Sequence, residues 1–212
     1  MGNSEIQASG LLLVWLEKSR GVSASDVVSN ILRDRGDALI VTGLGSTTWD
    51  AAAAGDHPNN FYLWGGMGGA AMTALGLARA QPKRRIIVLT GDGEMLMGLG
   101  SLATIGAAAP LNLAICVIDN QRYGETGMQE THTGHGVDLA AMAAGAGFAE
   151  TQTVWSKQGI EGAIPHLYET DGPVFVDVKV NTDRVPMVLP LRDGTAIRGR
   201  FREAVLGARA FD

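Results

Sequence analysis

Cysteine is almost absent from this chain, because Cys116 is the only one in 212 residues. A single cysteine cannot form a disulfide within the chain, and Cys116 lies in an apolar run, Ile115–Ile118, that predicts a buried strand. We therefore interpret Cys116 as a small core residue. An iron–sulfur subunit is disfavoured, because such clusters usually take four cysteine thiolates.

Basic residues are few and long apolar runs are missing. Lys and Arg number 17 against 22 Asp and Glu, which gives a net charge of −5. Nucleic-acid binding would require a basic stripe, so this class of partner is excluded. The longest N-terminal apolar run, Leu11–Leu16, lacks a basic leader and is far shorter than the roughly 20 residues of a membrane span. We expect a soluble, cytoplasmic protein.

Apolar residues make up 46% of the sequence, which is ample for the core of one α/β domain. Continuous apolar runs alternate with segments of helical pattern. The predicted strands are 39–41, 61–64, 86–89, 113–118, 148–154 and 174–180. The predicted helices are 26–35, 47–54, 69–80, 94–108, 137–144 and 156–168. This alternation predicts a doubly wound α/β fold, with a parallel sheet covered by helices on both faces.

The chain divides into three predicted parts. Residues 1–20 form an N-terminal arm, with a short docking helix over Leu11–Lys18. Residues 21–180 form the α/β domain, in which Ser25 caps the first helix and Gly36 ends it. Residues 181–212 hold two prolines and a basic amphipathic segment, 198–209, which predict a packing tail rather than a domain.

Polar residues follow two of the predicted strands. Gly91-Asp92-Gly93 ends the apolar run 86–89, and Asn120 ends the next run, 113–118. A carboxylate and an amide at neighbouring strand ends would place two oxygen ligands at the carboxyl edge of the sheet, a site that suits Mg²⁺. The alternative is an ordinary strand-to-helix turn, where Asp and Gly are common.

The same edge offers backbone groups for an anion. Gly91 and Gly93 allow close backbone approach, and the helix predicted to begin at Glu94 would point its amides at phosphate groups. The motif therefore predicts a Mg²⁺-diphosphate clamp. The segment Thr42–Thr47 follows the first strand on this edge and could add hydroxyl or amide donors, although Ser46 could instead cap the helix that follows.

These motifs resemble the cofactor signature of thiamine diphosphate enzymes, in which Gly-Asp-Gly precedes a pair of asparagines. Here the first of that pair is Asp119. The segments 61–68 and 119–129 are most similar to the β subunit of sulfopyruvate decarboxylase and to the C-terminal domain of phosphonopyruvate decarboxylase. The resemblance extends from about Ala38 to Val180.

The resemblance implies roles for individual residues. The side chains of Asp92 and Asn120 and the backbone carbonyl of Arg122 would bind Mg²⁺. The Gly65 carbonyl would accept a hydrogen bond from the cofactor's aminopyrimidine, and Met67 would wedge between its two rings, unless Met67 is plain core packing. The implied cofactor-binding residues are Ser46, Gly65, Met67, Gly91, Asp92, Gly93, Glu94, Asn120, Arg122 and Tyr123.

Glu94 departs from the small hydroxyl residue often found after Gly-Asp-Gly in this family. A carboxylate beside a diphosphate should repel it, so we expect the Glu94 amide to face the phosphate and its side chain to turn away. The loop 125–135 carries polar groups for a substrate pocket, namely Glu125, Gln129, Thr131, His132 and His135. His132 is the candidate proton carrier, although exposed loop histidines are common.

The family's chemistry also needs a glutamate from a pyrimidine-binding domain, for which residues 181–212 leave no room. The resemblance therefore implies a separate partner subunit that supplies it, and a heteromeric enzyme that decarboxylates a 2-oxo acid to an aldehyde or joins it to a second carbonyl compound.

Two alternative functions stay open. Gly66–Ala71 fits the dinucleotide pattern G-x-G-x-x-A, with Asp92 as the following acid. A non-catalytic scaffold subunit would retain the fold and the cofactor without turnover.

Overall fold

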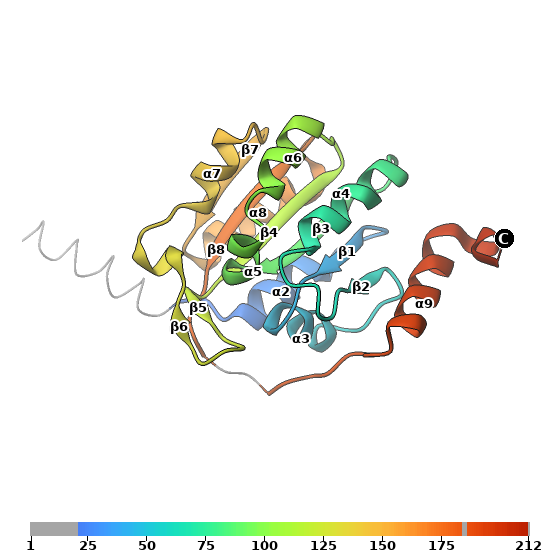
Figure 1. Cartoon of the computed structure of the whole chain (residues 1–212), viewed down its shortest axis with the longest axis horizontal. Coiled ribbons are helices and arrows are strands. Elements are labelled where there is room, and N and C mark those ends of the chain that lie inside the picture. The colour runs from blue at the N-terminus through green and yellow to red at the C-terminus, as the bar shows by residue number, and fades with distance from the viewer. Residues whose placement is uncertain (1–20, 184–185, 212) are drawn as a thin grey trace, which may run out of the picture.

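The computed structural model describes residues 21–183 and 186–211, so the arm expected over residues 1–20 lies outside the described part. Six parallel strands form one sheet in the order β2-β1-β3-β4-β8-β7 (Figure 1). The strands are β1 Leu39–Thr42, β2 Asn60–Tyr62, β3 Ile86–Gly91, β4 Leu113–Asp119, β7 Glu150–Val154 and β8 Val174–Lys179. This is the doubly wound α/β fold that the alternating pattern predicts.

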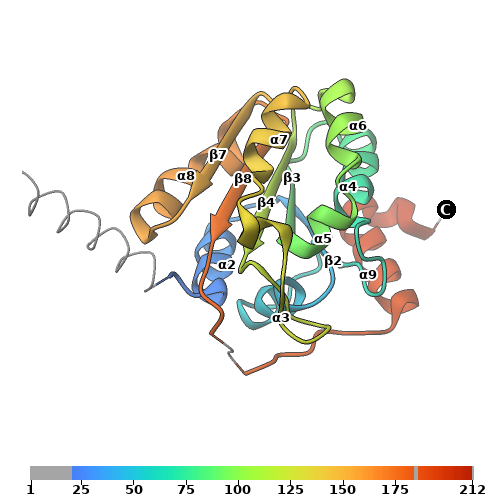
Figure 2. The ribbon, with the colours of Figure 1, turned by 60° about the vertical axis from the view of Figure 1, so that its left-hand side comes forward.

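The central strands β1, β3, β4 and β8 are almost entirely buried and largely apolar because the sheet is covered on both sides, whereas the edge strand β7 is mostly polar and partly exposed. The helices are α2 Ala24–Arg33, α3 Ser46–Ala53, α4 Ala70–Ala80, α5 Asp92–Met97, α6 Ser101–Ala108, α7 Leu139–Gly145, α8 Lys157–Glu169 and α9 Gly194–Leu206. Figure 2 shows α2 and α8 on one face of the sheet and α4 and α6 on the other. Successive strand residues enter opposite layers, so Ile87 packs with the first set and Val88 with the second.

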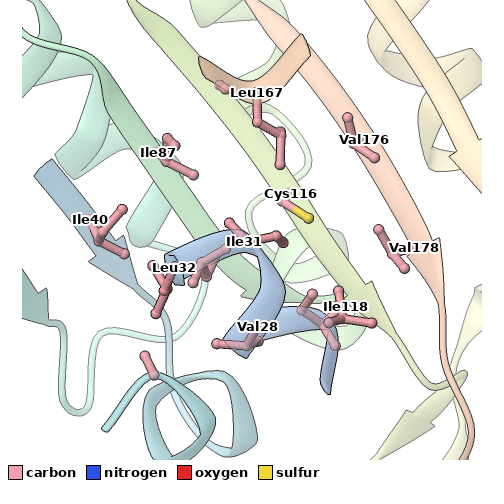
Figure 3. Packing of buried hydrophobic residues seen from close by; sticks show 14 of the residues in the cluster. Val28, Ile31, Leu32, Ile40, Ile87, Cys116, Ile118, Leu167, Val176 and Val178 are labelled. Carbon is pink, nitrogen blue, oxygen red and sulfur yellow. The ribbon is translucent and has the colours of Figure 1, made fainter. Parts of the chain in front are cut away.

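Cys116 lies in the layer under α2 and α8, as Figure 3 shows. Its side chain is fully buried, and burial raises the pKa of its thiol. Ile31 and Leu167 pack in the same cluster from α2 and α8. The interpretation of Cys116 as a small core residue is confirmed.

Most predicted boundaries shift by one to three residues, and two corrections are larger or concern a cap. The helix predicted over 94–108 is two helices, α5 and α6, and the first begins at Asp92 rather than Glu94. The break falls at Gly98, where an added Cβ would lie 2.2 Å from the Gly68 carbonyl oxygen. Position 98 requires glycine, because the loop before α4 passes too close for a side chain. The N-cap of α2 is Ser23 rather than Ser25, and its side chain makes no capping hydrogen bond.

The segment 121–136, which includes the predicted loop 125–135, contains regular structure. It forms the two-stranded hairpin β5 Arg122–Tyr123 and β6 Gln129–Glu130, and then the 3₁₀ helix η1 His132–His135. The tail holds α9 and a 3₁₀ helix, η2 Gly207–Phe211. Helix α9 packs at the β2 edge of the sheet, where Phe201 contacts Phe61 with ring centroids 5.2 Å apart.

Candidate functional site

Three neighbouring strands deliver the predicted motifs to one edge of the sheet. In the parallel register, Thr42 of β1 pairs with Leu89 of β3, and Gly91 at the end of β3 pairs with Ile118 of β4. Asp92 therefore follows β3 directly beside Asp119, the last residue of β4. The carboxyl edge of such a sheet is where α/β proteins bind ligands, and the sequence motifs meet there as expected.

Asp92 is a buried acid at this edge, with only 2% of its surface exposed. Its Oδ2 accepts a hydrogen bond from the Thr131 hydroxyl at 2.5 Å, and the Thr133 hydroxyl oxygen lies 3.3 Å from the same atom. Burial, and then the negative charge of Asp119, raise the pKa of Asp92 to about 7. A carboxylate held in this environment is stabilised by a cation, because burial disfavours its charged form.

A buried charge network lies behind Asp92. The Thr133 hydroxyl donates to Asp119 Oδ1 at 2.9 Å, and the Lys179 ammonium pairs with Asp119 Oδ2 and, at 2.8 Å, with Asp177 Oδ2. Burial raises the pKa of Asp177 to about 7. Lys179 thus provides the positive charge that allows Asp119 and Asp177 to share this site.

Sequence reasoning missed this network. Asp177 and Lys179 alternate within the otherwise apolar strand β8, and charged residues in a buried strand are a signal that was available. Thr131 carried no such signal. It was expected to line a substrate pocket, but it is fully buried and donates to Asp92. That expectation is wrong, because the hairpin turns Thr131 inward beneath the site.

Asn120 and Arg122 lie at the start of the hairpin. Asn120 is partly exposed, and its Oδ1 accepts a hydrogen bond from the Arg122 amide at 2.9 Å. The Arg122 guanidinium pairs with Glu130 at 2.6 Å. Its side chain is engaged along the hairpin, so only its backbone remains for the predicted role at the site.

The loop after β1 continues into α3. Gly45, with φ of 83°, is the N-cap residue and Ser46 is the first residue of the helix. The interpretation of Ser46 as the cap is therefore wrong, because the chain needs a positive φ one residue earlier, where glycine is favoured. Ser46 is exposed. Its role as a donor to a diphosphate stays a prediction.

A cavity of about 330 Å³ opens beside this edge, lined by Met67, Gly93, Leu96, Met97, Tyr123 and His132. Met67 is 37% exposed, so the alternative of plain core packing is wrong. Tyr123 covers Gly93, where an added Cβ would lie 2.7 Å from the ring. Its hydroxyl faces His132 Nδ1 at 3.4 Å.

Of the loop residues expected in a substrate pocket, His132 alone lines this cavity. His135 is exposed and pairs with Glu130 at 3.4 Å, and Gln129 bonds to Thr126 within the hairpin turn. Glu125 points at the loop after β1, where an added Cβ on Gly45 would lie 2.9 Å from Glu125 Oε1. The hairpin pairing directs these side chains away from the cavity.

The Glu94 carboxylate turns into the protein. Only 4% of the residue is exposed, and Oε2 accepts a hydrogen bond from the Leu44 amide at 3.0 Å.

Space is open elsewhere at this edge, since a Cβ added to Gly65 or Gly91 would meet nothing within 4 Å. Oxygen donors from Asp92 and Asn120, with open glycines beside them, fit a hard cation carrying an anionic group.

Comparison with known proteins shows the family to which the chain belongs. The family model of the thiamine pyrophosphate enzyme C-terminal TPP binding domain matches residues 43–178. The chain belongs to this family. The dinucleotide-binding interpretation of Gly66–Ala71 is set aside, because Asp92, its supposed ribose-binding acid, is buried against Thr131 and Thr133.

Curated members of the thiamine pyrophosphate enzymes include clear relatives. The β subunit of sulfopyruvate decarboxylase from Methanothermobacter thermautotrophicus is 35% identical over 187 residues, which cover 88% of this chain and 96% of that subunit. Phosphonopyruvate decarboxylase from Streptomyces viridochromogenes is 39% identical over 144 residues, which cover 68% of this chain and 36% of that enzyme. The chain thus matches about a third of the second relative and nearly all of the first.

Solved structures agree on the fold. A putative thiamin diphosphate-dependent enzyme from Mycobacterium smegmatis superposes with a TM-score of 0.66 at 23% identity, over 77% of this chain and 32% of that one. None of the helices in the described part of the chain combines the length and apolar character that a membrane span requires.

Proposed function

We propose that this chain is the thiamine diphosphate- and Mg²⁺-binding subunit of a heteromeric 2-oxo acid decarboxylase. The observation that carries the proposal is the buried carboxylate of Asp92 beside the end of β4, which Asn120 follows, at the sheet edge of a domain from this family. Asp92 and Asn120 would supply side-chain oxygens to Mg²⁺, and Arg122 its backbone carbonyl. Phosphate oxygens of the cofactor would complete the metal's shell.

When bound, thiamine diphosphate supplies the carbanion and electron-sink chemistry that decarboxylation of a 2-oxo acid requires. The protein's part is to hold and orient. Gly65 would accept the aminopyrimidine hydrogen bond, and Met67, at the mouth of the cavity, would set the angle between the rings. The apolar side chains of Leu96 and Met97 would limit water in the cavity they line. His132, with its Nδ1 facing the Tyr123 hydroxyl, is the candidate for proton transfer to substrate.

A partner subunit is part of the proposal. Relatives that match this chain over most of their length are named β subunits of sulfopyruvate decarboxylase. We infer that a pyrimidine-binding partner supplies the activating glutamate and closes the cavity. The test combines this chain with such a partner, thiamine diphosphate and Mg²⁺, and measures CO₂ and aldehyde release from pyruvate, 3-sulfopyruvate and 3-phosphonopyruvate.

Turnover in the complex but not with either subunit alone supports the proposal. A complex that forms and binds cofactor without turnover of any 2-oxo acid would favour the scaffold alternative. Carboligation would be recognised by adding a second aldehyde and finding a 2-hydroxy ketone in place of the released aldehyde.

A further inference from the structure

Glu94 is a buried acid at a position where the family signature often has a small hydroxyl residue. Its Oε2 accepts the Leu44 amide at 3.0 Å, whereas its Oε1 is buried without a hydrogen bond of good geometry. A buried carboxylate is costly unless neighbouring groups stabilise its charge. We therefore consider which groups lie close enough to stabilise the Glu94 carboxylate.

Those groups come from three separate segments. The Glu94 carboxylate faces the Thr90 hydroxyl and the backbone amides of Leu44, Ala70 and Gly68. Thr90 belongs to β3, Leu44 to the loop after β1, and Gly68 and Ala70 to the loop that carries Met67 into α4. Ala70 begins α4, so the carboxylate also lies at the positive end of that helix.

Gly43 leaves the space that the carboxylate fills. A Cβ added to Gly43 would lie 1.4 Å from Glu94 Oε2. Gly43, Leu44 and Glu94 thus pack as one unit, and any residue larger than glycine at position 43 would displace the carboxylate.

We propose that Glu94 is a positioning residue whose buried carboxylate holds the loop after β1 and the Met67 loop in the arrangement that receives the cofactor. The inference rests on the proposed cofactor site and deepens it. It also predicts the opposite effect on cofactor affinity from the one expected from charge alone. Removing a negative charge beside an anionic diphosphate should tighten cofactor binding by Coulomb's law alone, whereas loss of a positioning group should weaken it.

The first test needs no cofactor. Amide hydrogen exchange of the full chain is compared for wild type, Glu94→Gln and Glu125→Gln, the last being an exposed carboxylate beside the same loop at Gly45. We expect Glu94→Gln to speed exchange at least about tenfold in residues 43–48 and 65–72, with β3 and β4 unchanged, and Glu125→Gln to leave all of these unchanged. Unaltered exchange in both loops, or uniformly faster exchange throughout, would overturn the proposal.

The second test is calorimetric titration with thiamine diphosphate at saturating Mg²⁺. We expect Glu94→Gln to raise Kd about tenfold, the lower end of effects seen for groups that orient metal ligands. Unchanged or tighter binding by Glu94→Gln overturns this inference but leaves the proposed function intact, whereas wild type that fails to bind even with its partner overturns the function itself.

Gly43→Ala provides an independent variant should Glu94→Gln not fold. Because its Cβ displaces the carboxylate, it should reproduce the exchange pattern of Glu94→Gln, and the double variant should be no worse than either single one. Additive effects would mean that the two residues act separately, which contradicts the proposal.

Discussion

Thr131→Val tests how the site holds Asp92. The substitution keeps the shape of the side chain and removes a hydroxyl that donates to Asp92 Oδ2 at 2.5 Å, between residues that are 0% and 2% exposed. Hydrogen bonds to charged groups contribute about 1.5–3 kcal/mol, so we expect a loss of that size in the free energy of unfolding at pH 8, where Asp92 is ionised.

The same change should affect cofactor binding. Thr131 lowers the pKa of Asp92, and its removal both frees the carboxylate to rotate and favours its protonation. Groups that orient metal ligands typically contribute 10- to 100-fold to affinity, and we expect the Kd for thiamine diphosphate with Mg²⁺ to rise by about that factor.

Denaturant unfolding and calorimetric titration measure the two effects. Ser101→Ala is the matched control, because it removes a buried hydroxyl that has no hydrogen-bond partner. We expect it to change stability by less than about 0.5 kcal/mol. The reasoning is refuted if Thr131→Val matches this control in both stability and cofactor affinity.

Three further variants probe other parts of the structure. Lys179→Met leaves Asp119 and Asp177 buried without their cation and should cost about 3–5 kcal/mol at pH 8. The loss should be smaller at pH 5, where Asp177, whose pKa burial raises to about 7, is protonated; equal loss at both pH values would contradict the network. Asp50 is 3% exposed, and burial raises its pKa to about 6. Ionisation of Asp50 therefore lowers the free energy of unfolding as pH rises from about 4 through 6, and the loss reaches roughly 3 kcal/mol once the carboxyl is fully ionised. Asp50→Asn should therefore raise Tm at pH 7.5 but not at pH 4, and a uniform shift would refute this origin. Gly98→Ala should lower the free energy of unfolding by about 1–3 kcal/mol, because the new Cβ clashes with the Gly68 carbonyl. Its control is Gly162→Ala, whose Cβ meets nothing within 4 Å and which should be neutral or stabilising by up to about 1 kcal/mol. Equal unfolding energies for the two variants would count against the close approach at Gly98.

Most of the fold could be predicted from local sequence patterns. Apolar runs marked the central strands, because a strand buried on both faces has few polar positions, whereas the edge strand β7 is mostly polar and gave a weaker signal. The meeting of Asp92 with the end of β4 also followed from the sequence, since parallel strands share one carboxyl edge. These features depend only on the order and composition of short segments.

The features that the sequence did not predict are set by contacts between distant segments. The helix break at Gly98 lies where the Gly68 carbonyl passes too close for a side chain, and the buried Thr131 directly follows the hairpin pairing of Arg122 with Glu130. The burial of Glu94 beneath Leu44 likewise joins residues fifty positions apart. No local pattern encodes such contacts, although the charged pair Asp177 and Lys179 in an apolar strand was a readable signal.

The most direct test of the central claim is calorimetric titration of the chain, alone and with its partner subunit, with thiamine diphosphate in Mg²⁺ and then in EDTA. Wild type and Asp92→Ala are compared, with NAD as the competing ligand. The account predicts binding of thiamine diphosphate that requires both Mg²⁺ and the Asp92 carboxylate, and no binding of NAD. Thiamine diphosphate binding that persists in EDTA or in Asp92→Ala, or metal-independent NAD binding, would contradict it.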